Sequence, residues 1–113
     1  MATVSGGIKI NAAVSVDGSL AAAGSLNLYT APATGYAIVN VWLNNASTSI
    51  TLKNDGKTIF VLNGTFEAPI TGAAAAVIGS MPVYVGPGKV LSYTQAGAGA
   101  SEVVVTGVEF INL

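Results

Sequence analysis

The sequence predicts an all-β protein, an antiparallel β-sandwich with a jelly-roll-like topology and about eight short strands. Short blocks rich in β-branched residues recur along the chain, and Gly, Pro, Asn and Asp separate them. One block alternates strictly between two kinds of side chain, which is the period of a β-strand. No segment has the pattern of a crossover helix, so two sheets must pack on each other. An immunoglobulin-like sandwich is the rival topology.

Size and composition predict one folded domain. The chain has 113 residues, of which 51% are hydrophobic, and its net charge is −1. These values exclude disorder, and the length suits a single domain. We expect a β-sandwich domain over residues 8–113, preceded by an N-terminal arm over residues 1–7.

The expected strands follow one another at short intervals, and turn residues separate them. In chain order they cover Ile8–Val16, Ala21–Tyr29, Tyr36–Asn44, Ser49–Lys53, Lys57–Leu62, Val83–Val85, Lys89–Gln95 and Glu102–Ile111. Asp55-Gly56 tolerates the positive φ angles of a tight hairpin, and Asp17-Gly18 is also typical of a turn. Pro87 lies between two glycines and predicts a further turn.

The strand Tyr36–Asn44 has the clearest alternation. Its odd-numbered residues are all aliphatic and predict the core face. The even-numbered face carries Tyr36, Ile38 and Trp42 together with the amide side chains of Asn40 and Asn44. Because Trp and Tyr are enriched in protein contacts, we expect Tyr36 and Trp42 to belong to a subunit interface.

Two other segments carry specific expectations. The segment Val103–Val105 is apolar on both faces, which predicts a central strand or a strand covered by a neighbouring chain, and Gly107 is a candidate bulge in that strand. The segment Thr71–Ser80 is rich in alanine but too short between its glycines to sustain a free helix. We expect a loop or a short turn of helix there.

The low charge content predicts that neighbours cover much of the surface. Only 8% of the residues are charged, against roughly 25% in ordinary soluble domains, and the chain has no His. A surface of small neutral residues is poorly protected against association. Four scattered lysines give no electrostatic footprint for nucleic acid. The longest purely apolar run, Ala73–Ile78, is far shorter than the roughly 20 residues that span a bilayer, so we expect no membrane partner.

The sequence offers little material for catalysis or for a cofactor. His and Cys are absent, which excludes Ser–His and Cys–His nucleophiles and zinc–thiolate sites. The carboxylates that could act in pairs are Asp17, Asp55, Glu67, Glu102 and Glu109. Glu102 and Glu109 are an odd number of residues apart and point to opposite faces unless a bulge intervenes. The lysines lie mainly beside turns, and the aromatic residues lie mainly within strands. We therefore expect no enzymatic activity, no metal and no cofactor.

Three motifs carry a family resemblance. The segments Leu28–Val41, Val83–Tyr93 and Val105–Phe110 contain a Leu-Tyr-Thr-x-Pro entry, a Tyr-Val-x-Pro-Gly turn and a Val-x-Gly-Val-Glu-Phe exit. With these motifs the chain resembles the small β-sandwich proteins of tailed-phage virions. That family includes capsid cement (decoration) proteins and the knobs or tips of tail fibres.

The resemblance implies a structural function in a virion. The expected protein is a capsid decoration subunit, often a homotrimer, that binds the major capsid protein on the capsid exterior after assembly in the host cytoplasm. The alternative is a tail-fibre or tail-tip module that recognises a glycan or protein on the host surface. The short chain favours the first, because fibre proteins carry a long shaft. A cellular lectin is a third, weaker interpretation.

Overall fold

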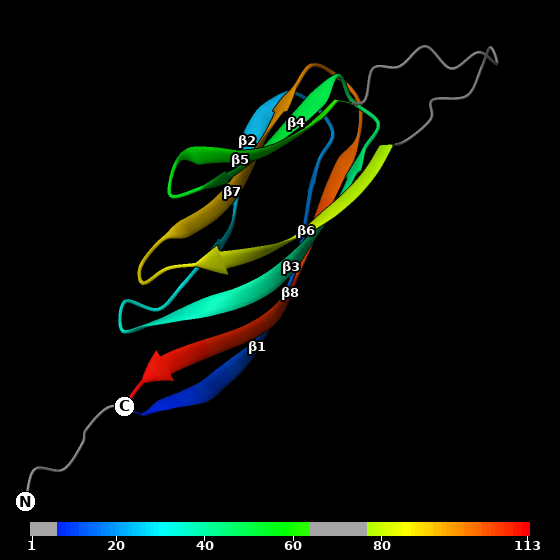
Figure 1. Cartoon of the computed structure of the whole chain (residues 1–113). Helices are drawn as coiled ribbons and strands as arrows, with labels where there is room; N and C mark the ends of the chain where they lie inside the picture. The colour runs from blue at the N-terminus through cyan, green and yellow to red at the C-terminus, as the bar shows by residue number, and fades with distance from the viewer. Residues whose placement is uncertain (1–6, 64–76) are drawn as a thin grey trace, which may run out of the picture.

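The computed structural model describes residues 7–63 and 77–113, which form two four-stranded antiparallel sheets packed face to face (Figure 1). The strands are β1 (Ile8–Leu20), β2 (Gly24–Thr30), β3 (Gly35–Asn45), β4 (Ser49–Asn54), β5 (Lys57–Asn63), β6 (Val77–Val85), β7 (Val90–Ala96) and β8 (Ser101–Asn112). The prediction of an all-β sandwich is confirmed. The described residues include no helix that could span a membrane.

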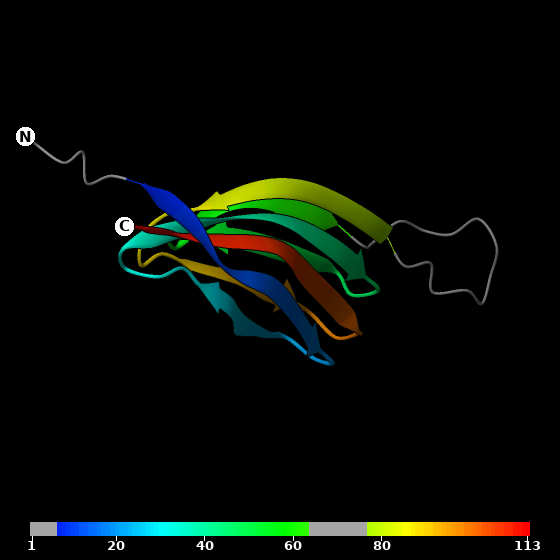
Figure 2. The same cartoon turned by 90° about the horizontal axis from the view of Figure 1, so that it is seen from below.

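The strand order is that of a jelly roll. The first sheet has the order β1-β8-β3-β6 and the second has the order β2-β7-β4-β5. Strands β1 and β8, β2 and β7, β3 and β6, and β4 and β5 therefore pair, as if one long hairpin had been rolled up. The immunoglobulin-like rival is wrong, because its sheets have other strand orders. Figure 2 shows β1 and β2 along one flank of the sandwich and β5 and β6 along the other.

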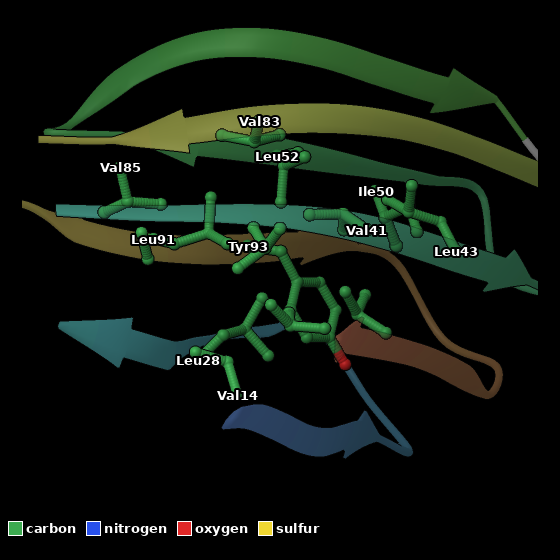
Figure 3. Close-up of a cluster of buried hydrophobic side chains, with 14 of the residues drawn as sticks. Val14, Leu28, Val41, Leu43, Ile50, Leu52, Val83, Val85, Leu91 and Tyr93 are labelled. Atoms are coloured by element: carbon green, nitrogen blue, oxygen red, sulfur yellow. The ribbon is translucent and has the colours of Figure 1, made fainter. Parts of the chain in front are cut away.

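The core lies between the two sheets and follows the alternation of the strands. On β3 the odd-numbered residues Ala37, Val39, Val41 and Leu43 are buried, as predicted. Other strands contribute Val14, Leu28, Ile50, Leu52, Val83, Val85, Leu91 and Tyr93 (Figure 3). Leu62, Val103 and Val105 belong to the same cluster. Burial of these side chains is the main favourable term in folding.

The predicted turn at Asp17-Gly18 is wrong. Both residues lie inside β1, where they pair with Val104 and Val103 of β8. Gly18 is buried, and a Cβ atom at this position would lie 2.6 Å from a methyl group of Leu28. The glycine therefore serves close packing between the sheets and not a change of chain direction.

The predicted loop or helical turn over Thr71–Ser80 is wrong where the structure describes it. Residues 77–80 form the first part of β6, which runs antiparallel to β3 from Val77 to Val85. Pairing with a distant strand overrides the weak local propensity of this segment. Residues 71–76 lie outside the described residues.

The expected bulge at Gly107 is also wrong. Strand β8 keeps a continuous register with β3, and the irregularity lies in β1, between Ile10 and Ala12. A Cβ atom on Gly107 would lie 2.2 Å from the carbonyl oxygen of Ile38, so glycine lets the two backbones approach. The prediction that β8 is a central strand is confirmed, because it lies between β1 and β3.

The expected hairpin at Asp55-Gly56 is confirmed, with φ angles of 57° and 74°. Of the expected N-terminal arm, residues 1–6 lie outside the described residues. The carbonyl of Gly7 accepts a hydrogen bond from the amide of Leu113 at 2.7 Å, so the start of the described chain lies against its end.

Candidate interaction surface

The side of the first sheet that faces away from the second sheet is unusually apolar, and we call it the outer face. Strand alternation and register place on it Ile8, Ile10, Tyr36, Ile38, Trp42, Ile78, Pro82, Tyr84, Val104, Val108 and Phe110. Ile10 is 68% exposed, Ile78 61% and Tyr84 57%. Single exposed apolar residues are ordinary, but an apolar patch that crosses four strands, as Ile10, Phe110, Tyr36, Ile38 and Tyr84 do at one end of the face, is typical of an interaction site. A row with Ser15, Thr106 and Asn40 separates this patch from Trp42 and Val104.

An aromatic ladder crosses the outer face near the ends of its strands. The rings of Tyr36 and Phe110 have centroids 5.1 Å apart with planes at 25°, and the rings of Tyr36 and Tyr84 have centroids 5.3 Å apart with planes at 33°. The rings of Tyr36 and Phe110 are stacked, whereas the ring of Tyr84 is tilted against that of Tyr36. The stacked pair therefore covers one face of each of its two rings, which leaves less flat ring surface for stacking against a sugar.

Both predicted interface residues lie on the outer face. Tyr36 is half-buried at the centre of the aromatic ladder. Trp42 is half-buried further along β3, opposite Ser80 on one side and Val104 on the other. The two residues share the face but not the ladder.

Sequence reasoning missed most of this surface. Ile8 and Ile10 were not singled out, Ile38 was placed on the same face as Tyr36 and Trp42, and Tyr84 and Phe110 were noted only as aromatic residues. Their common location follows from the pairing of β1, β3, β6 and β8, which are far apart in sequence. The sequence signal that could have revealed this surface is the recurrence of apolar residues at alternate positions of each of these strands.

The charged groups of the outer face lie at the end of the first sheet that is opposite the aromatic ladder. Among the described residues these are Asp17 of β1 and Glu102 of β8, which lie on neighbouring strands. A hydrogen bond that the protonated Glu102 carboxyl donates to Asp17, together with the charge of Asp17, raises the pKa of Glu102 above its usual range. A shallow, mostly apolar depression adjoins Glu102 and is also lined by Ser19, Asn44, Ala46, Ala100 and Ser101.

Glu109 holds a polar contact between the two sheets. Its carboxylate accepts hydrogen bonds of 2.5 Å from the hydroxyl of Tyr29 on β2 and from the amide of Asn11 on β1. These bonds lower the pKa of Glu109, while burial and Glu109 itself raise the pKa of Tyr29 well above its usual range. Glu109 and Glu102 point to opposite faces of β8, as their odd spacing predicts.

The remaining candidate groups are dispersed. Lys89 and Asp55 form an exposed ion pair of 3.3 Å between two turns. Glu67 lies outside the described residues. Within residues 7–63 and 77–113 no three acidic side chains come together as a metal site would require.

Comparison with protein-family models, with curated proteins and with solved structures gave no match. The resemblance to phage virion proteins therefore stays a prediction from the three sequence motifs.

Proposed function

We propose that this chain is a structural protein of a tailed-phage virion, a decoration subunit that binds the major capsid protein on the exterior of the shell. The observation that carries the proposal is the outer face, which exposes apolar and aromatic side chains over four strands and has its two charges at one end. Such a face loses little by being covered, because almost no charge must be desolvated.

In the proposed mechanism, the chain stabilises the shell by burying additional interface area between itself and the capsid subunits. Each copy would contact more than one capsid subunit, so that opening the shell must also expose the apolar side chains of the outer face to water. Exposure costs about 25 cal/mol per Å² of apolar surface, and many copies on one shell multiply that cost. The homotrimer that the resemblance implies is a separate prediction.

The outer face favours a protein partner over a glycan. Carbohydrate sites commonly offer a free aromatic face, whereas Tyr36 and Phe110 direct ring faces toward one another. The tail-fibre alternative, with a host glycan as ligand, therefore has less support. A glycan array with no bound sugar is the expected result.

Counting the copies in purified virions tests the proposal. A decoration protein is expected at hundreds of copies per particle, measured by gel densitometry against the major capsid protein. A dozen or two copies would identify a fibre component instead. Absence from the virion would overturn both functions.

A further inference from the structure

The four edge strands of the sandwich differ in how they resist pairing with another chain. An exposed edge offers unpaired N–H and C=O groups, and proteins block it with proline, lysine, bulges or short strands. On β6 the block is Pro82 near the middle, and the amide of Asn54 donates to the carbonyl of Tyr84 at 2.8 Å. Strands β2 and β5 have seven residues each and an irregular register with their neighbours.

Strand β1 lacks these blocks over Ala12–Leu20. These nine residues pair with β8 in an unbroken register and contain no proline and no lysine. None of the described residues other than those of β8 forms a backbone hydrogen bond with this segment. The side chains that flank the free edge on the outer face are small, namely Ala13, Ser15 and Ser19, except for Asp17. Figures 1 and 2 show β1 as the outermost strand of its sheet.

We infer that a second copy of this chain pairs with the free edge of β1, antiparallel and around a two-fold axis. A second copy fits for two reasons. The other edges of the described sandwich are short, irregular or blocked by proline. The edge of a second copy that is best able to pair with β1 is therefore the β1 edge of that copy. The net charge of −1 also gives two copies little mutual repulsion. In a two-fold contact the same surface serves both partners.

The sequence of the segment favours one register. If Val16 lies opposite Val16 of the second copy, Ala12 lies opposite Leu20 and all nine residues pair. This register places Asp17 opposite Ser15 of the second copy and not opposite its own carboxylate. The two first sheets then form one continuous sheet with a continuous outer face. The inference does not rest on the proposed function, and it favours a two-fold assembly over the homotrimer that the resemblance implies.

A pair of substitutions of opposite charge at position 15 tests this register. Ser15→Asp places a carboxylate opposite Asp17 twice in each dimer, whereas Ser15→Lys places an ammonium group there. From cross-strand pair energies, we expect Ser15→Asp to weaken the dimer by about twofold to thirtyfold. Ser15→Lys should leave it unchanged or tighten it. Sedimentation velocity of the full chain across concentrations measures both, and circular dichroism confirms that the variants fold.

A second measurement separates the edge from the outer face. In the full chain, amide hydrogen exchange of β1 should slow as concentration rises, because its outward amides gain partners. Ile38→Asn, which removes an exposed apolar side chain two strands away, should leave the dimer intact. A chain that stays monomeric up to about 1 mM, a trimer, or equal effects of the two charges at position 15 would each overturn the inference.

Discussion

Glu109 shows how one side chain joins strands from both sheets. Its carboxylate binds Tyr29 and Asn11, and these hydrogen bonds lower its pKa. A carboxyl group with a lowered pKa stabilises the fold above its ordinary pKa, and that stabilisation is lost as the pH falls through the lowered value. We expect the melting temperature to fall below about pH 4.5, the ordinary value. Glu109→Gln should lower the melting temperature by a few degrees at pH 7, and the melting temperature of this variant should fall less as the pH is lowered.

Glu102 on the same strand is the matched control with the opposite sign. Its pKa is raised by Asp17, so the ionised pair costs stability at neutral pH and the cost disappears as the pH falls. Glu102→Gln should therefore raise the melting temperature slightly at pH 7 and have no effect near pH 3. Equal pH responses of the two glutamine variants in thermal denaturation would contradict this account.

Gln95 is a buried amide whose hydrogen bonds order the turn between β7 and β8. Its Nε2 donates to the carbonyls of Gly97 at 3.0 Å and Gly99 at 2.6 Å, and its Oε1 accepts from the hydroxyl of Ser101. Gln95→Leu keeps the volume but removes this donor from the two glycine carbonyls and leaves the Ser101 hydroxyl with only the hydroxyl of Tyr93. We expect a loss of about 2 kcal/mol in the free energy of unfolding, measured with urea. A loss under about 0.5 kcal/mol would show that water replaces the amide.

At the scale of elements, Gly107 controls how closely β8 approaches β3. An added Cβ would lie 2.2 Å from the carbonyl oxygen of Ile38 and 2.6 Å from the Cα of Val39, so the strands would have to separate. Gly107→Ala should cost about 3 kcal/mol in unfolding free energy. Gly86→Ala is the control, because its Cβ would lie 3.6 Å from the nearest atoms, and it should be nearly neutral. Similar losses for both would contradict the close-approach role.

Local pattern was sufficient to predict most strands but not their irregularities. Alternation in β3 predicted its buried face, and Asp55-Gly56 predicted its hairpin, because both signals lie within a few residues. The bulge at Asn11 is a mismatch between β1 and β8, which lie at opposite ends of the chain. The contact of Tyr29 with Glu109 depends on how the two sheets stack. Both features depend on residues that are far apart in the sequence, so no short segment of the sequence could predict them.

For the candidate interaction surface, the sequence correctly placed Tyr36 and Trp42 on one face of β3. It could not show how far that surface extends over the rest of the sheet. The face becomes a patch only when β1, β8 and β6 line up beside β3. Ile10 and Phe110 are direct partners in that register, although 100 positions separate them. Sheet order, set by long-range pairing, was needed to bring them together.

At the scale of the whole molecule, the outer face should determine attachment to the shell. Trp42→Ser and Tyr84→Ser each remove apolar area from it, and we expect at least about a tenfold loss in co-sedimentation affinity for shells that lack the chain. The β content of the variants should be unchanged. Val61→Ser is the matched control, because Val61 is 48% exposed on a strand of the second sheet. Equal weakening by all three would contradict a specific role for the outer face.

The central proposal is that neighbours in a virion cover much of the sparsely charged surface of this chain. Single-particle reconstruction of the phage shell, with and without the chain, tests it most directly. We predict extra density on the shell exterior at hundreds of equivalent positions, with the outer face of the first sheet against the capsid. Identical reconstructions of the two shells, with the chain recovered as free protein, would contradict the claim.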